Sequence, residues 1–350
     1  MKMSFRWYGD DDPVTLQKIR QIPGVSTIVT AVYDVPVGQV WPMESILHMK
    51  KEVEDAGLLF EVIESIPVHE DIKLGKSSRD RYIENYCENI RRVAKAGIKC
   101  ICYNFMPVFD WTRTQLDHRL SDGSTSLVYY QEQVDKVNPL NSDSDLTLPG
   151  WDASYTRDQL HDVVAEYQQL TEEDLWSNLA YFIHAVIPVA AECGVNMAIH
   201  QDDPCWSIFG LPRIITDEKS LDRFLALEDD PHHGLTLCTG SLGCSAKNDV
   251  AHMAYKYSKM GRIHFAHLRQ VQVLDNGFEE RGHLSSWGSL DMFEIVRSLY
   301  LGGFDGYIRP DHGRMIWGDT GRAGYGLYDR ALGATYLNGL WEAVSKSYKR

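Results

Sequence analysis

The stretch YIRPDHGRM, residues 307–315, joins the end of an apolar strand to a group of chemically active side chains. Tyr307 and Ile308 are residue types that favour a buried β-strand, and Arg309, Asp311 and His312 follow within a few positions. In parallel α/β folds, the strand ends surround one shared pocket, and the chemistry takes place there. The stretch therefore predicts a buried strand that leads directly into a functional site.

Seven further apolar runs of strand length precede this one and alternate with helical patterns. The expected strands are residues 3–8, 26–32, 59–65, 99–105, 195–201, 235–239, 262–268 and 305–311. The expected helices are residues 13–21, 42–56, 78–96, 172–193, 217–227, 246–260, 288–300 and 325–346. This alternation predicts an α/β fold, a (β/α)8 TIM barrel formed by residues 1–350 as a single domain. An open doubly wound sheet is the alternative, and it is disfavoured because no G-x-G-x-x-G motif follows the first strand.

Residues 106–171 are too long for an ordinary barrel loop. About 65 residues separate the fourth strand from the helix at 172, whereas such loops usually have roughly 2–6. The segment contains Trp111, a turn signal at 121–124 and a short helical pattern near 157–170. We therefore expect an insertion after strand four that acts as a lid or as a contact in a homodimer or higher oligomer.

The composition is that of an ordinary globular protein, with 44% hydrophobic residues and a formal net charge of −14. This charge disfavours a nucleic-acid partner, because such binding neutralises phosphates, but it permits a small anionic substrate. The sequence shows neither a membrane-spanning apolar run nor a secretory leader pattern, so we expect a cytoplasmic protein. The seven cysteines, an odd number, are expected to be reduced thiols.

Potential metal ligands fall at the ends of four consecutive expected strands, the fifth to the eighth. They are His200, Cys238, His267 and Asp311. Ala198, Thr236 and Phe265, two residues before the first three, should share their inward face. Imidazole, thiolate and carboxylate are suitable ligands for Mn²⁺, Fe²⁺, Co²⁺ or Zn²⁺. The two anionic ligands would also balance the charge of a buried divalent ion.

Each of these residues has a simpler interpretation when taken alone. A histidine at a strand end is more often hydrogen-bonded core than ligand, Cys238 could be a small buried residue, and Asp311 could support a turn. Their coincidence at equivalent strand ends favours a shared metal site. Other histidines illustrate the simpler interpretation: His264 should face the helices, and His233 lies in a Pro-Gly loop where we expect it to be solvated.

Short motifs along the chain closely resemble those of the D-mannonate dehydratase family. They are RWYGDDDP (6–13), HEDIK (69–73), CYNFMPVFDWTRT (102–114), QDDP (201–204), CTGS (238–241), HLR (267–269) and RPDHG (309–313). The resemblance covers essentially the whole chain. It implies a metal-dependent TIM-barrel hydro-lyase of hexuronate (glucuronate) catabolism, which converts D-mannonate to 2-dehydro-3-deoxy-D-gluconate (KDG) and water with Mn²⁺ or Fe²⁺. The family's metal pattern matches His200, Cys238, His267 and Asp311.

Dehydration of mannonate requires a base for the C2 proton and an acid for the C3 hydroxyl. His312 follows Asp311 directly, and an imidazole can carry a proton in either direction. Tyr325, between two glycines in a loop after the last strand, can reach into the barrel mouth. We expect this pair to supply acid and base, with Tyr325 as the base by a small margin. The reverse assignment stays open, as does a supporting hydrogen-bond role for His312.

Further residues are candidates for substrate binding. Arg269, two residues after His267, could clamp the carboxylate, although a salt bridge at the rim is equally consistent. Glu64 and Asn104 end strands three and four and could bind hydroxyl groups. Trp111 could close over the substrate or pack in the interior, and Arg309 could hold Asp311 in its coordinating rotamer.

Two other enzyme classes and one non-catalytic class remain as alternatives. A sugar isomerase or epimerase on a similar barrel commonly uses two carboxylates with histidine, or two metals, so the single Cys238 and the pair His312 and Tyr325 favour a lyase. A metal-dependent nuclease is disfavoured by the acidic charge. A sugar-acid-binding barrel without catalysis would leave His312 and Tyr325 without a purpose.

Overall fold

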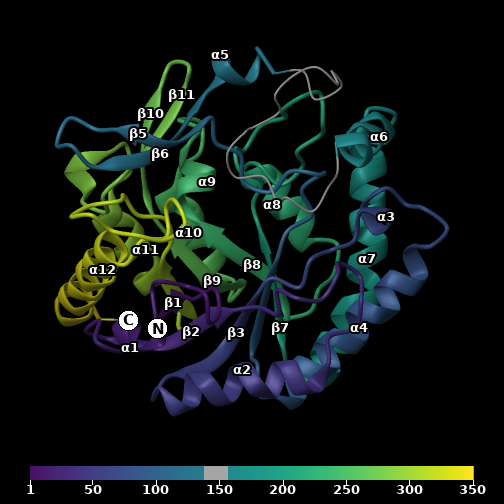
Figure 1. Cartoon of the computed structure of the whole chain (residues 1–350), viewed down its shortest axis with the longest axis horizontal. Helices are drawn as coiled ribbons and strands as arrows, with labels where there is room; N and C mark the ends of the chain where they lie inside the picture. Colours follow the sequence, from purple (N-terminus) through teal and green to yellow (C-terminus); the bar gives the residue numbers. More distant parts are fainter. Residues whose placement is uncertain (138–156, 350) are drawn as a thin grey trace.

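A computed structural model describes residues 1–137 and 157–349 and shows a closed barrel of eight strands surrounded by helices (Figure 1). Around the barrel, the strands are β1 (Lys2–Arg6), β12 (Tyr307–Pro310), β9 (Ile263–Leu268), β8 (His233–Cys238), β7 (Asn196–His200), β4 (Cys100–Tyr103), β3 (Leu59–Glu64) and β2 (Val25–Thr30). All neighbouring pairs are parallel. The predicted TIM barrel is confirmed, and every strand overlaps the range expected from the sequence.

Eight helices also match their expected ranges. They are α1 (Leu16–Arg20), α2 (Met43–Asp55), α4 (Arg79–Lys95), α7 (Glu172–Cys193), α8 (Glu218–Leu225), α10 (Val250–Lys259), α11 (Met292–Gly302) and α12 (Tyr328–Ser347). The longest, α7, has clear boundaries: Thr171 and Asp174 form a capping box at its start, and Gly194 takes the left-handed conformation (φ 65°) after its end. The other helical elements of the described residues are α3 (Glu70–Lys73), α5 (Gln131–Val134), α6 (Arg157–Tyr167), α9 (Thr239–Gly243) and the 3₁₀ turn Ser285–Trp287.

The inside of the barrel is filled by its own small cluster, separate from the larger core. The cluster consists of Val29, Val62, Cys100, Cys102, Ala198, Phe265 and Tyr307. Because alternate residues of a strand face the same side, the inward position of Phe265 also directs His267 inward and His264 outward. The inward orientation expected for Ala198 and Phe265 is therefore confirmed.

A second sheet, which the sequence did not predict, lies beside the barrel (upper left of Figure 1). Its antiparallel order is β10 (Gln270–Leu274), β11 (Gly277–Arg281), β6 (Thr125–Tyr130) and β5 (Gln115–Arg119). The hairpin of β10 and β11 follows barrel strand β9, whereas β5 and β6 belong to segment 106–171. Within that segment, residues 138–156 lie outside the described part, and its role as a lid stays a prediction.

One histidine differs from its expected environment. His233 is fully buried as the first residue of β8, so the prediction that it is solvated is wrong. The strand begins two residues earlier than expected and carries the imidazole inside, where Nε2 donates to the carbonyl oxygen of Phe224 at 2.9 Å. Burial lowers the pKa of His233 to about 4.

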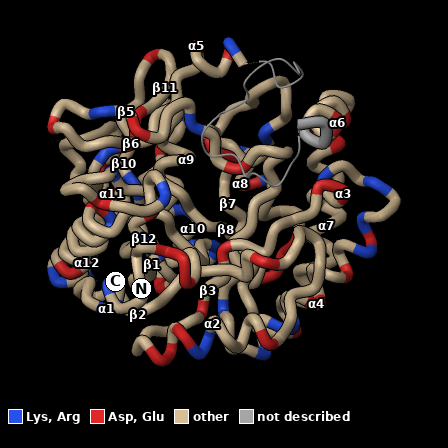
Figure 2. Tube along the Cα trace, viewed as in Figure 1, with Lys and Arg blue, Asp and Glu red and all other residues tan. Residues whose placement is uncertain are grey.

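The chain's surface and thiols agree with the composition. All seven cysteines are free thiols, as expected, and six of them are buried. Figure 2 shows acidic and basic residues interspersed along the outer helices. On α2, for example, Lys51 pairs with Asp55 and Lys50 with Glu54 one helical turn apart. Within residues 1–137 and 157–349, no helix has both the length and the apolar character needed to cross a membrane.

Candidate active site

A cavity of about 1500 Å³ opens at the carboxyl ends of the barrel strands. Eight of the eleven residues singled out in the sequence line it: Glu64, Asn104, Trp111, His200, Arg309, Asp311, His312 and Tyr325. The other three, Cys238, His267 and Arg269, are almost completely buried and do not line the cavity. The structure therefore places eight of the predicted residues on the surface of one cavity and the other three in the buried interior.

Three of the four predicted metal ligands form a compact cluster. One ligand atom each from His200, Cys238 and His267 lies within 4.8 Å of the others. In the barrel, Cys238 is the register partner of His267, which places their side chains next to each other. Two imidazoles and one sulfur at this separation are arranged as donors around a transition-metal ion would be.

Asp311, the fourth predicted ligand, borders this cluster just after the end of β12. Its Oδ2 lies 3.7 Å from Cys238 Sγ, and its Oδ1 lies 3.9 Å from His267 Nδ1. The carboxylate is also paired with arginines, since Oδ1 is 2.7 Å from Arg309 Nη2 and Oδ2 is 2.9 Å from Arg269 Nε. Asp311 could therefore join the donors while its rotamer is fixed by two guanidinium groups.

The donor set has the charge that a cation needs. Burial would raise the pKa of the Cys238 thiol, but Arg269 and His200 hold it well below its usual value, so this group is a thiolate. Burial opposes protonation of His200, yet Cys238, Asp311 and Glu64 raise its pKa to about 9. The buried His267 Nε2 atom has no partner with full hydrogen-bond geometry among the described residues, and its contact with Glu64 Oε2 is 3.4 Å long. These groups fit a divalent metal ion, which would take the place of the proton on His200 and engage His267 Nε2.

A second arrangement shares His267 but fits a metal less well. Glu64, Cys102 and His267 also lie within 4.8 Å of one another. However, burial and the nearby Glu64 raise the pKa of the Cys102 thiol well above its usual value. A protonated thiol is a poor ligand, so the cluster with Cys238 is favoured.

The predicted acid–base pair is in direct contact. His312 Nε2 lies 3.0 Å from the Tyr325 hydroxyl, and His312 Nδ1 lies 2.8 and 2.9 Å from the two oxygens of Glu280. Burial would raise the pKa of Glu280, but His312, Arg269 and Arg113 lower it to about 2. An ionised Glu280 accepts a hydrogen bond from the Nδ1–H group of His312. The other ring nitrogen, Nε2, is then unprotonated and accepts a hydrogen bond from the Tyr325 hydroxyl. The imidazole is thus oriented by a carboxylate that the sequence did not indicate.

Glu280 belongs to a buried ion-pair network that connects the two sheets. Arg113 pairs with Asp203 through both oxygens (2.8 and 3.0 Å) and with Glu280 at 2.6 Å. Arg269 also contacts Asp203 (2.5 Å) and Glu280 (2.6 Å). Ser241 Oγ lies 3.1 Å from both Asp203 and Cys238 Sγ, which links this network to the candidate metal ligands.

The position of Arg269 does not favour the predicted carboxylate clamp. Its side chain is 1% exposed, and its nitrogens face Asp203, Glu280 and Asp311 instead of the cavity. A guanidinium with three carboxylates around it has no free edge for a substrate. The physical reason is that the strand β9 ends at Leu268, and the next residue already belongs to the connection into the second sheet.

The other predicted binding residues keep access to the cavity. Glu64 pairs with Arg309 at 2.8 Å, and nearby cations hold its pKa well below the usual value although burial would raise it. Asn104 accepts a hydrogen bond from the Met106 amide at 3.2 Å. The ring of Trp111 meets that of His312 edge to face, with centroids 5.2 Å apart. These side chains surround the same space as the acid–base pair.

Sequence reasoning did not identify four buried residues of this site: Arg6, Arg113, Asp203 and Glu280. Arg113 and Asp203 stand in the quoted motifs DWTRT and QDDP, so their positions were visible although their roles were not. Arg6 is the last residue of β1 and begins the motif RWYGDDDP, which gave the same kind of signal. Glu280 has no such signal, because it lies in a hairpin whose strands were not expected.

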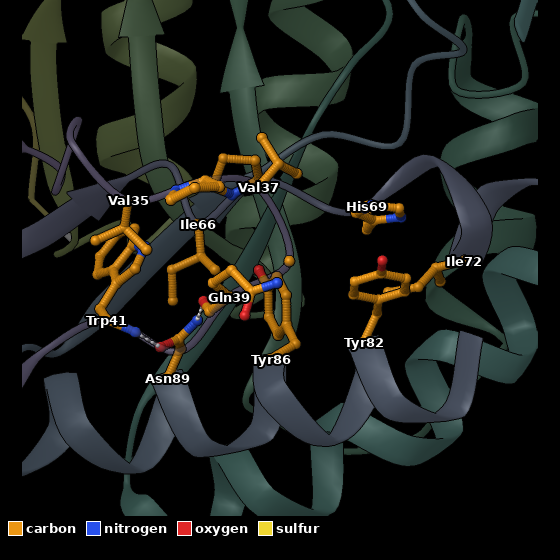
Figure 3. Close-up of a pocket in the computed structure, with 13 residues that line it drawn as sticks. Val35, Val37, Gln39, Trp41, Ile66, His69, Ile72, Tyr82, Tyr86 and Asn89 are labelled. Atoms are coloured by element: carbon orange, nitrogen blue, oxygen red, sulfur yellow. Dashed lines mark hydrogen bonds between the residues drawn. The ribbon is translucent and has the colours of Figure 1, made fainter. Parts of the chain in front are cut away.

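A much smaller cavity lies outside the barrel, between the loop after β2 and helix α4 (Figure 3). Its volume of about 10 Å³ is enough for a single water molecule. The His69 and Tyr82 rings stack beside it at 3.6 Å, and Asn89 accepts from the Trp41 amide while donating to the carbonyl of Gln39. These contacts hold a loop against a helix, and they indicate a packing role.

Comparisons with known proteins cover the entire chain. Residues 1–350 match the sequence model of the family described as D-mannonate dehydratase (UxuA). Mannonate dehydratase 2 of Halalkalibacterium halodurans is 55% identical over 346 residues, which is 99% of this chain and 100% of that protein. The mannonate dehydratase of Streptococcus uberis is 55% identical over 350 residues, all of both chains.

Solved structures agree with these sequence matches. The crystal structure of mannonate dehydratase from Streptococcus suis serotype 2 superposes with a TM-score of 0.92, at 54% identity over 99% of this chain and 95% of that one. A xylose isomerase domain protein from Planctomyces limnophilus superposes with a TM-score of 0.54 at 13% identity, covering 99% of each chain. The second likeness shows the barrel fold alone.

Proposed function

The chain belongs to the D-mannonate dehydratase family and is a metal-dependent hydro-lyase acting on mannonate, and we propose that its product is 2-dehydro-3-deoxy-D-gluconate. This reaction would serve hexuronate (glucuronate) catabolism. The observation that carries the proposal is the contact of Glu280, His312 and Tyr325 at the same barrel mouth as the donors His200 and Cys238. A proton-transfer pair and a cation site together suit a dehydration next to a carboxylate.

We propose Mn²⁺ or Fe²⁺ as the ion, held by His200, Cys238, His267 and Asp311. A bound divalent ion supplies Lewis acidity to a substrate oxygen. The support from this chain is the donor chemistry: a thiolate, a carboxylate, and two imidazoles, one with a nitrogen that has no partner of full hydrogen-bond geometry among the described residues. Arg309 and Arg269 each hold one oxygen of the Asp311 carboxylate, Oδ1 at 2.7 Å and Oδ2 at 2.9 Å.

The acid–base roles that we propose reverse the marginal preference drawn from the sequence. Burial and Tyr8 raise the pKa of Tyr325 well above its usual value, so Tyr325 keeps its proton and suits the role of acid. We propose that His312 Nε2 takes the C2 proton while the Tyr325 hydroxyl protonates the departing C3 hydroxyl, which leaves as water. The proton on Nε2 then passes to the Tyr325 oxygen, 3.0 Å away, and both groups return to their starting states.

The remaining roles concern the surroundings of the reaction. We propose that Glu64 and Asn104 bind hydroxyl groups of the sugar acid and that Trp111, with segment 106–171, covers the substrate. The cavity wall supports this, because Leu116, Val163 and Glu166 of that segment line the same space. We also propose a cytoplasmic enzyme that forms a homodimer or a higher homo-oligomer, consistent with sugar-acid catabolism and with the length of the segment.

The test is an assay of the purified protein, loaded in turn with Mn²⁺ and Fe²⁺, on D-mannonate. We expect a product that is lighter than the substrate by one water and that reacts as a 2-keto-3-deoxy acid. The matched control is His312→Asn under the same metal loading. A product of unchanged mass would indicate an isomerase or epimerase, and tight binding without any product would indicate a sugar-acid-binding barrel. Either result would overturn the proposal.

A further inference from the structure

Two buried arginines at the cavity have guanidinium donors that the described residues do not fully use. Arg6 ends β1, Arg309 lies in the neighbouring strand β12, and both line the cavity. Their side chains are 9% and 1% exposed. In each, Nε and Nη1 have no hydrogen-bond partner among the described residues. Buried guanidinium donors without partners are costly, so this arrangement favours an anion in the adjacent space.

The protein supplies too few carboxylates here to neutralise both cations. Glu64 is shared between them, with Oε1 at 2.8 Å from Arg309 Nη2 and Oε2 at 3.3 Å from Arg6 Nη1. Asp311 is likewise shared between Arg309 and Arg269. Among the described residues, Arg6 is therefore the cation whose single carboxylate partner, Glu64, is already engaged by another arginine. Arg269 differs, because three carboxylates surround it.

We propose that Arg6, together with the unpartnered edge of Arg309, binds the carboxylate of the substrate. This inference rests on the proposed function, and it moves the carboxylate site from Arg269, which does not line the cavity, to Arg6 and Arg309, which do. Guanidinium groups suit the purpose because they form short, charge-assisted hydrogen bonds with both oxygens of a carboxylate.

The surroundings of Arg6 match the chemistry of the reaction. Its guanidinium lies 4.8 Å from the centre of the Tyr8 ring, and Tyr8 meets Tyr325 edge to face at 5.0 Å. The guanidinium of Arg309 lies 6.0 Å from the centre of the Tyr325 ring. Since C2 is bonded to the carboxylate carbon, a carboxylate held here keeps C2 near the Tyr325 and His312 pair. The two arginines thus select an acid over a neutral sugar and orient it.

The test compares two arginines of the same cavity. Arg322 also lines it and stacks on Tyr8 at 4.3 Å, but it is exposed to solvent, so Arg322→Met is the matched control. With metal-loaded enzyme and D-mannonate, we expect Arg6→Met to raise KM by about 10–100-fold, the loss of one charge-assisted interaction. Arg6→Lys, which keeps the charge, should recover part of this, and Arg322→Met should change KM by less than about 3-fold.

A second readout separates carboxylate binding from general damage. D-mannitol carries the same hydroxyl groups without a carboxylate, and its inhibition constant should be the same in wild type and Arg6→Met. A wild-type KM in Arg6→Met, or an equal weakening of mannitol and mannonate, would overturn the inference while leaving the proposed function intact. If the wild type produces no dehydrated product, the proposed function fails. Calorimetric binding of mannonate and mannitol to wild type, Arg6→Met and Arg6→Lys then decides the inference by the same comparison.

Discussion

The two ends of the barrel place the same side chain in opposite electrostatic states. Near the amino ends of the strands, His233 of β8 and His264 of β9 are buried, and burial lowers their pKa values to about 4 and about 3. Near the carboxyl ends, His200 is surrounded by anions that raise its pKa to about 9 in spite of burial. The histidines near the amino ends of the strands, the lower end of the barrel, are therefore neutral. His200, near the carboxyl ends at the barrel mouth, binds a proton readily.

The comparison shows that neighbouring charges, and not burial alone, decide the state of a buried group in this barrel. At the mouth, Arg113 and Arg269 hold Glu280 and Asp203 ionised although both are buried. At the lower end, the Nδ1 atom of His233 has no partner among the described residues, so a proton there would be buried without an acceptor. The lower end of the barrel contributes to stability, and the mouth contributes the groups for catalysis. Three experiments test this difference.

The largest effect is expected from a ligand at the mouth. Cys238→Ala should lower kcat/KM by about 10³-fold or more, because a Lewis-acid metal contributes several kcal/mol to the transition state. Metal content, measured by mass spectrometry of the purified protein, should fall with it. The matched change near the amino end of the neighbouring strand β9, His264→Gln, should keep metal content and activity within about 3-fold while lowering the melting temperature. Full metal content in Cys238→Ala would remove Cys238 from the ligand set.

A smaller loss is expected from the proton-transfer pair. Tyr325→Phe and His312→Asn should each lower kcat by about 10²–10⁴-fold, the range typical of general acid–base catalysis, with metal content unchanged. Tyr33→Phe is the control, since that hydroxyl also lies on the cavity wall but bonds to the carbonyl of Trp7 at 3.3 Å. The acid–base assignment is wrong if Tyr325→Phe and His312→Asn both keep full activity.

The smallest effect concerns stability at the lower end. Because the pKa of His233 is about 4 when folded and about 6.5 when unfolded, its neutral form stabilises the fold fully above about pH 6.5, and this contribution is lost as the pH falls toward 4. The difference corresponds to at most about 3 kcal/mol. His233→Gln, which can still donate to Phe224, should flatten the loss of unfolding free energy across this window in denaturant titrations. Equal slopes in wild type and variant would contradict this.

The barrel could be predicted from the sequence because each of its strands is a short apolar run that its own residues identify as a strand. In a barrel of parallel strands, the carboxyl ends of all strands surround one pocket. This rule alone was enough to predict that His200, Cys238 and His267 lie together. The second sheet could not be predicted in this way. Its strands QLDHR (115–119) and GFEER (277–281) are polar, and each pairs with a neighbour in its own hairpin, β5 with β6 and β11 with β10. The two hairpins form one sheet only because β11 also pairs with β6, a segment far away in the chain.

Separation along the chain also explains why some interactions of the site were missed. Arg269 could be recognised as a buried cation near the site, but its partners Asp203 and Glu280 come from other loops. The orienting carboxylate of His312 lies in the hairpin of β10 and β11, whose local signals, the alternating QVQV run (270–273) and the Asn276-Gly277 turn, were not used to predict strands. Interactions between loops depend on the folded arrangement, and no periodicity in one segment reveals them.

The contacts between segment 106–171 and the hairpin of β10 and β11 also have a consequence for the order in which the enzyme folds during synthesis. Arg113 and Ser126 form hydrogen bonds with Glu280, from which they are separated by 167 and 154 positions of the chain. The second sheet and its ion pairs can therefore form only after most of the polypeptide has been synthesised. His312 and Tyr325 are synthesised later still. Barrel fragments can form earlier, but a nascent chain has no working proton relay until its last helix is being made.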